Sequence, residues 1–125
     1  MTPSLARAVL LTQLLLLLLG TQMPGALRAG IEAGLHAPFG VSSLGHFVLF
    51  TGMAWLASAR PLSWPWPRVL LAALALACAT EALQFVAIDR HPQWMDVGID
   101  LAGTVAGLLL VAGGHSRRGR RSNRV

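Results

Sequence analysis

Four stretches of the chain are almost free of polar side chains and approach the length needed to cross a membrane. They cover residues 6–23, 43–59, 68–88 and 95–113. A bilayer core about 30 Å thick requires about 20 mostly apolar residues in a helix, because lipid offers the backbone no hydrogen bonds. The pattern therefore predicts an all-α integral membrane bundle of four transmembrane helices, in which residues 1–125 form a single membrane domain.

The remaining segments have the composition of connections. Residues 25–42 are rich in glycine and small residues, residues 61–67 contain three prolines, and residues 89–94 contain Pro92, so we expect loops there. Residues 114–125 form a basic tail. The first stretch has a second interpretation, because Arg7, the leucine run and the small residues at 26–29 are also typical of a cleaved signal peptide. We favour a retained helix, since 20 uncharged residues are long for a signal sequence.

Composition excludes several other classes of protein. Only 12% of the residues are charged and 54% are hydrophobic, whereas soluble domains carry about 25% charged residues. Disorder and a soluble globule are therefore excluded. Cys78 is the single cysteine, which excludes a disulfide framework and a cysteine-based metal cluster. The net charge of +5 does not indicate nucleic-acid binding, because half of the ten arginines lie in the last nine residues. There they act as an orientation signal and contact anionic lipid.

The distribution of arginine predicts the orientation in the membrane. Eight arginines flank the spans at the N-terminus, in the second connection and in the tail, whereas the first and third connections hold only Arg28 and Arg90. Basic segments stay in the cytoplasm. We therefore expect a multi-pass protein of the cell (inner or plasma) membrane with both termini cytoplasmic. Trp64 and Trp66 would then mark the inner interface and Trp94 the outer one.

This orientation assigns the polar residues of three spans to one layer near the outer face. Glu81 is seven residues before the expected end of its span, about 10 Å below it at 1.5 Å per residue. Asp100 lies about 6 Å deeper than Asp96 by the same rise. The full set consists of His46, Glu81, Gln84, Asp96 and Asp100, with Arg90 in the connection.

Helical spacing places these residues on defined faces. Glu81 and Gln84 share one face of the third span. Asp96, Asp100, Gly103 and Gly107 share one face of the fourth span, and the two glycines form a GxxxG step that permits close helix packing. We expect the third and fourth spans to pack side by side at Gly103 and Gly107, with the acids facing inward.

The energetics of the membrane argue that this layer is functional. An ionisable group at mid-membrane costs about 2.5–3.5 kcal/mol and is functional by default. We therefore expect Glu81 and Asp100 to face protein or water, with Arg90 and His46 as partners. Three carboxylates and one arginine are not neutral, so we expect either a charged His46 or a protonated acid, for which Glu81 is the candidate.

The order of these residues resembles the signature of VanZ-like membrane proteins, E-x2-Q-x5-R-x5-D-x3-N-x2-G-x3-G, preceded by a His-Phe pair in an earlier span. The chain supplies His46-Phe47, Glu81, Gln84, Arg90, Asp96, Gly103 and Gly107, so seven of eight positions match over about residues 42–110. Two positions depart from the pattern. Asp100 replaces asparagine, and Ser42-Ser43 replace an Asp-Lys pair, so the site is more negative than in other members.

The resemblance implies a protein of the cell envelope. The named member of the family confers low-level resistance to the glycopeptide antibiotic teicoplanin, a lipid-tailed molecule that acts on cell-wall precursors at the outer membrane face. An outward polar site is in the right position for such a role. We expect no cofactor.

Three functions remain open from the sequence. The first is a non-enzymatic protein that binds a lipid head group or a lipid-linked wall precursor through His46, Glu81, Gln84, Arg90, Asp96 and Asp100, with Arg90 suited to phosphate or carboxylate. The second is a small enzyme acting on such a head group, with Glu81 or Asp96 as general acid/base and His46 assisting. The third is a proton-coupled exporter subunit. We favour the first, because no nucleophile motif is present and the inner halves of the spans lack ionisable residues. No ligand spacing supports a metal site.

Overall fold

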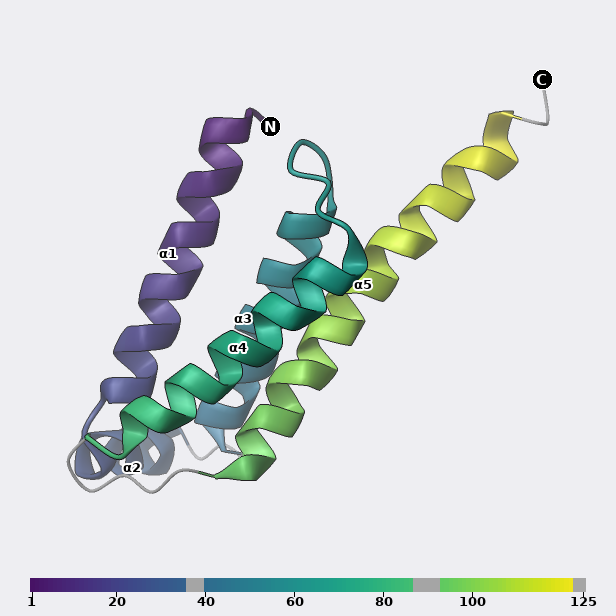
Figure 1. Cartoon of the computed structure of the whole chain (residues 1–125). Helices are drawn as coiled ribbons and strands as arrows, with labels where there is room; N and C mark the ends of the chain where they lie inside the picture. The colour runs from purple at the N-terminus through teal and green to yellow at the C-terminus, as the bar shows by residue number, and fades with distance from the viewer. Residues whose placement is uncertain (36–39, 87–92, 123–125) are drawn as a thin grey trace.

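The computed structural model describes residues 1–35, 40–86 and 93–122, with side chains up to residue 114. Within these ranges the chain forms five helices and no strand: α1 (Pro3–Gln22), α2 (Gly25–Leu35), α3 (Val41–Ser58), α4 (Trp66–Gln84) and α5 (Trp94–Ser122). Four of them, α1, α3, α4 and the Trp94–Gly114 part of α5, are long and apolar enough to cross a membrane (Figure 1). The predicted all-α class with four candidate spans is confirmed.

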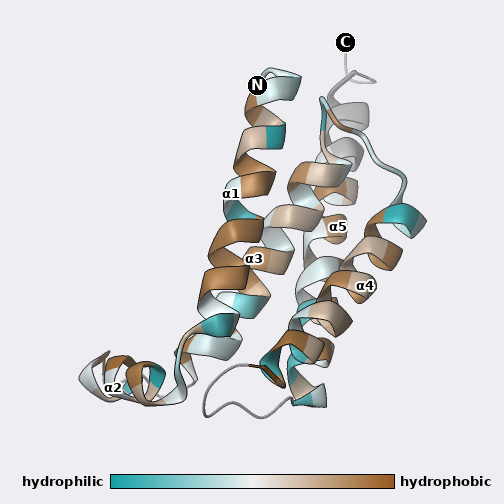
Figure 2. Ribbon diagram, turned by 60° about the vertical axis from the view of Figure 1, so that its left-hand side comes forward, coloured by the Kyte–Doolittle hydropathy of each residue, from teal (hydrophilic) through white to brown (hydrophobic). Residues whose placement is uncertain are grey.

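The connection after the first span differs from the prediction. Residues 25–42 were expected to form a loop, but α2 occupies most of this segment and runs crosswise to the spans, projecting to one side at one end of the bundle (Figures 1 and 2). Leu27, Ile31 and Leu35 recur at every fourth position of α2, and all three are exposed. An exposed apolar stripe on a short helix beside membrane spans is typical of a helix that lies in the membrane interface.

The ends of two spans also differ from those expected. The third span was predicted to reach residue 88, but α4 ends at Gln84, so Glu81 lies in its last turn and closer to the end of the bundle than predicted. The expected tail from residue 114 begins as helix, because the backbone of α5 continues to Ser122.

The glycine step of the fourth span packs against a helix other than the expected one. A Cβ atom at Gly103 would lie 2.5 Å from the backbone oxygen of Phe47, and one at Gly107 would collide with the backbone oxygen of Thr51. Both neighbours belong to α3, so the prediction that α4 is the partner of these glycines is wrong. The α3–α5 contact is the most extensive between helices, and α4 packs beside α5. Helix spacing alone defines a face but does not identify the helix that covers it.

The molecule has two chemically different ends. The start of α1, the α3–α4 connection and the end of α5 lie at one end, and α2 lies at the other (Figure 1). Hydrophobic residues make up most of α1, and hydrophilic residues gather where α4 ends and α5 begins (Figure 2). Small side chains allow the helices to approach closely, because the buried core combines Leu17 and Phe50 with alanines from α3 and α4.

Candidate functional site

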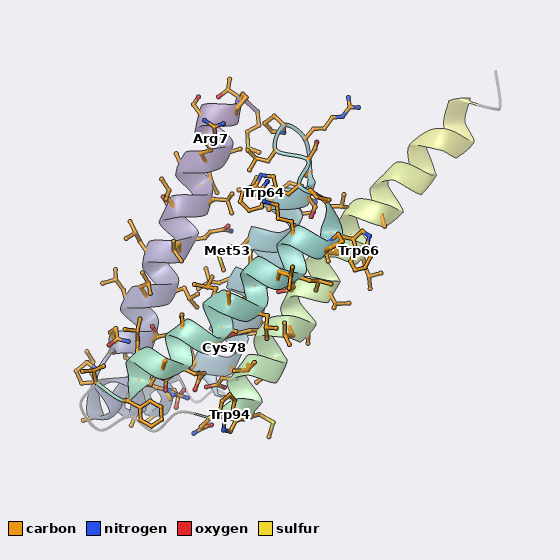
Figure 3. The ribbon with its side chains drawn as sticks, viewed as in Figure 1. Arg7, Met53, Trp64, Trp66, Cys78 and Trp94 are labelled. Atoms are coloured by element: carbon orange, nitrogen blue, oxygen red, sulfur yellow. The ribbon has the colours of Figure 1, made fainter. Side chains whose placement is uncertain are left out.

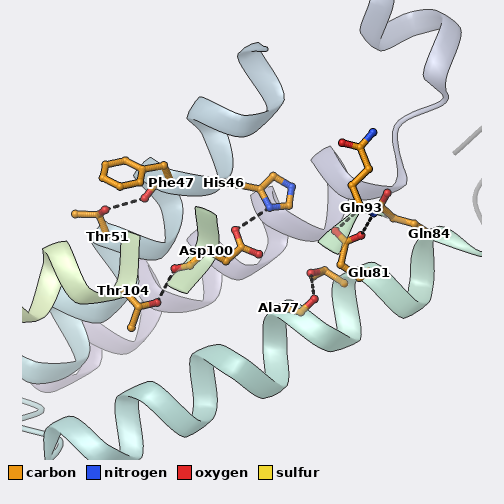
Figure 4. A network of polar contacts seen from close by, with 10 residues as sticks. His46, Phe47, Thr51, Ala77, Glu81, Gln84, Gln93, Asp100 and Thr104 are labelled. Atoms are coloured by element: carbon orange, nitrogen blue, oxygen red, sulfur yellow. Dashed lines mark hydrogen bonds and ion pairs between the residues drawn. The ribbon is translucent and has the colours of Figure 1, made fainter. Parts of the chain in front are cut away.

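A buried histidine–aspartate pair joins α3 to α5. His46 Nδ1 lies 2.9 Å from Asp100 Oδ1, and the two residues are 4% and 0% exposed (Figure 4). They face each other because the close approach at Gly103 brings the N-terminal halves of the two helices together. The aspartate oxygen accepts from the ring N–H, which fixes the orientation of the imidazole. The structure thus pairs two predicted site residues that are 54 positions apart.

The second oxygen of this aspartate has no matching donor. Among the described residues nothing donates to Asp100 Oδ2, although it is buried. Thr104, which the sequence argument did not single out, lies one turn further along and donates its hydroxyl to the Asp100 carbonyl oxygen at 2.8 Å. Its spacing of four residues from Asp100 could have indicated it. A buried oxygen without a donor is unusual in folded proteins and marks this position as a site of interest.

Glu81 forms a second polar unit, between α4 and the start of α5. Gln84 Nε2 donates to Glu81 Oε1 at 2.9 Å, and the backbone N–H of Gln93 donates to Oε2 at 2.7 Å (Figure 4). Glu81 and Gln84 are 4% and 2% exposed. The pairing of Glu81 with Gln84 follows from their spacing on one helical face. The contribution of Gln93 could not be predicted, because a backbone donor carries no side-chain signal.

The two units belong to one electrostatic cluster. Asp96 is 5% exposed, and the charges of Asp96, His46 and Asp100 all act on Glu81. The structure therefore brings together His46, Glu81, Gln84, Asp96 and Asp100, as the shared layer predicted. Arg90, the predicted cation of this set, lies outside the described residues. Its role and the protonation of Glu81 stay predictions.

A cavity of about 200 Å³ lies beside His46, between α1, α2 and α3. Its polar lining residues are His46, Ser42, Arg28 and Glu32, and leucines from α1 and α3 supply much of its apolar lining. Arg28 Nε donates to Glu32 Oε1 at 3.1 Å, and the backbone N–H of Ser42 donates to the same oxygen at 3.4 Å. Arg28 and Ser42 were not predicted as site residues, because the segment that carries Arg28 was expected to be a loop.

This arrangement suits recognition of an anion or movement of a proton. A histidine oriented by a buried carboxylate can accept or donate a proton at its second nitrogen. A guanidinium carries five donors, so pairing through Nε is compatible with binding a further anion. Among the described residues no three His, Cys, Asp or Glu side chains are grouped so as to hold a metal ion.

The fold and the buried cluster together define a helical membrane protein of four candidate spans with a polar site at one end of the bundle. The family model described as VanZ/LLP1 matches residues 7–113, which is most of the chain and covers most or all of each candidate span. The chain therefore belongs to the VanZ/LLP1 family, as the resemblance predicted. No curated protein and no solved structure matches it.

Proposed function

We propose that this protein binds the anionic head group of a membrane lipid or of a lipid-linked cell-wall precursor. The observation that supports this most directly is the cavity beside His46, whose lining combines polar and apolar residues. A lipid-linked anion needs both, because its head group requires donors while its chain stays in an apolar environment. Arg28 lines this cavity together with its partner Glu32, and the remaining N–H groups of its guanidinium can donate to the head group.

We infer that the site faces outward. The polar cluster lies at the end of the bundle opposite the start of α1 and the end of α5 (Figure 1). Arginine counts favour cytoplasmic termini. With that orientation the cavity faces the outer leaflet of the cell membrane, where lipid-linked wall precursors are used. Binding such a precursor would alter sensitivity to teicoplanin, which acts on the same molecules.

Native mass spectrometry of the purified protein tests the binding function. We expect a bound lipid phosphate that is retained by the parent protein and lost in Arg28→Gln and in Arg90→Ala, two variants that remove a cation from the proposed site. Arg60→Gln, which removes an arginine at the other end of the bundle, is the control and should retain the lipid. Retention of the lipid in both site variants would contradict the proposal.

Susceptibility measurements test the cellular consequence. A host that produces the parent protein should show a higher inhibitory concentration of teicoplanin than one that produces Arg28→Gln. A glycopeptide without a lipid tail serves as the control compound. An equal effect on both compounds would point to a general change in the envelope and away from a site for lipid-linked ligands.

One observation favours an enzymatic alternative. The His46–Asp100 pair has the geometry by which a carboxylate orients a general base. In this alternative His46 takes a proton from water or from a head-group hydroxyl, and Glu81 or Asp96 acts as the acid. Incubation of the reconstituted protein with a polyprenyl phosphate, followed by phosphate release, distinguishes the two functions. Release that is lost in His46→Gln would establish the enzyme.

A further inference from the structure

A second cavity lies between α1, α3 and α4, and extends from Thr104, next to the polar cluster, towards the opposite end of the bundle. It measures about 470 Å³ and its wall is apolar apart from Arg7 and Thr104. We call it the α1–α4 crevice; it is lined by Arg7, Leu10, Leu11, Leu14, Phe50, Met53, Ala54, Ala57, Trp64, Val69, Ala72, Ala73, Leu76 and Thr104. Its volume is within the range of about 300–1,000 Å³ that is usual for ligand sites.

The crevice is shorter than one leaflet of a bilayer. Its α1 wall runs from Arg7 to Leu14 and its α4 wall from Val69 to Leu76, so the last residue is seven positions after the first in each case. Seven residues of helix span about 10 Å, and half of a hydrocarbon core is about 15 Å thick. An acyl chain that enters at the Arg7 end would therefore remain within its own leaflet.

The entrance of the crevice is positively charged and has no described counter-ion. Arg7 and Trp64 lie at this end of the bundle and Met53 lies deeper (Figure 3). Arg68 lies over the Trp64 ring, 4.5 Å from its centroid. All four acids among the described residues belong to α2, to the last turn of α4 and to the first two turns of α5, at the opposite end. The cations at the entrance thus favour an anionic ligand.

We propose that the α1–α4 crevice binds one acyl chain of an anionic phospholipid, whose phosphate contacts Arg7 and Arg68. The apolar wall accommodates the chain, and the two guanidinium groups recognise the phosphate. This site differs from the polar cluster in its position, its lining residues and the leaflet it serves. It tethers α1, which packs mainly against α3 and α4, to the rest of the bundle through a lipid.

Quenching of Trp64 by brominated lipid tests the site directly. In a protein that keeps Trp64 and carries Trp55→Phe, Trp66→Phe and Trp94→Phe, we compare vesicles that contain brominated phosphatidylglycerol or brominated phosphatidylcholine at the same mole fraction. We expect stronger quenching by phosphatidylglycerol. Arg7→Gln should lower this preference about fivefold, the factor that corresponds to about 1 kcal/mol for one arginine near a charged lipid.

Matched variants separate the head-group contact from the acyl-chain contact. Arg7→Lys should keep most of the preference, and Arg60→Gln, which removes a charge at the same end but outside the lining, should keep all of it. Ala72→Phe places a ring in the crevice and should lower quenching by both lipids. Ala75→Phe, three residues further along α4 and outside the lining, should not.

Three results would overturn the proposal. Equal quenching by the two lipids in the parent protein would exclude an anionic head group. Unchanged quenching in Ala72→Phe would exclude an acyl chain in the crevice. Loss of all quenching together with a dimer in native mass spectrometry would show that a second copy of the chain covers this face.

Discussion

At the scale of single residues, the His46–Asp100 contact gives this chain a property that an asparagine would not. An asparagine at position 100 would keep an oxygen that accepts from the imidazole, whereas aspartate also permits a charged pair with His46. The departure from the family pattern therefore changes the charge that the site can carry while keeping its geometry. When His46 is charged, it offsets part of the negative charge that Asp100 adds to the site.

Removing one member of this pair should destabilise the bundle more than removing both. His46→Phe leaves Asp100 buried without a described partner, and breaking a buried pair costs about 3–5 kcal/mol. Addition of Asp100→Ala removes the remaining charge and should recover most of that loss. Unfolding in mixed micelles with increasing SDS measures both variants.

Leu44→Ala is the control for this experiment. Leu44 is on the same helix, two residues before the histidine, and is 54% exposed, so the substitution should change the stability little. If the double variant is as unstable as His46→Phe alone, the loss comes from packing of the ring and not from a buried charge.

The residues of the cluster were predictable from sequence to different degrees. Glu81, Gln84, Asp96 and Asp100 could be found because helical spacing and depth depend only on sequence position. The partner of each could not be found, because it depends on how the helices pair. The segment with Arg90 lies outside the described residues, so its predicted role stays untested by the structure.

At the scale of helices, hydropathy predicts spans and says little about their neighbours. Every lipid-facing surface is apolar, and so is most of the surface between helices, so the two are not distinguished by composition. This explains why four spans were found while the partner of Gly103 and Gly107 was assigned incorrectly. The helix α2 was missed because its three glycines favour a loop on propensity alone.

Filling the space at Gly107 should separate α3 from α5. A Cβ atom at this position would lie 2.9 Å from both the Ala54 Cβ and the Trp55 backbone nitrogen. Backbone atoms of a helix cannot move aside as a flexible side chain can, so Gly107→Leu should exceed the usual 1–3 kcal/mol cost of overpacking. We expect a large loss of folded protein in membranes, measured by protease resistance.

The control for the Gly107→Leu experiment is a substitution at an exposed position of α5. Leu109 is 65% exposed, so Leu109→Ala should leave the yield of folded protein unchanged. Similar yields of the Gly107→Leu and Leu109→Ala proteins would contradict the α3–α5 contact described above.

At the scale of the whole molecule, the orientation of the chain in the membrane determines which leaflet each of the two proposed sites faces. The polar cluster and its cavity lie at one end of the bundle, and the Arg7 entrance of the crevice lies at the other. A single reversal of the chain in the membrane would exchange the leaflets that both sites face. The orientation is therefore the property on which the most functional conclusions depend.

Reporter fusions at three positions test that orientation. Fusions after Ser58, at the end of α3, and at Ser116, in the C-terminal part of α5, should report a cytoplasmic location, whereas one at Gly34 in α2 should report an extracytoplasmic one. The physical reason is that eight arginines lie at the first end and two at the second. Replacement of Arg7, Arg60 and Arg68 by glutamine should increase the fraction of inverted protein, because it removes three of the eight charges that hold this end in the cytoplasm.

A cytoplasmic Gly34 in the parent protein would place the polar cluster at the inner face. It would exclude a role for the cluster with outer-leaflet precursors, while leaving the His46–Asp100 pair and the helix packing as described.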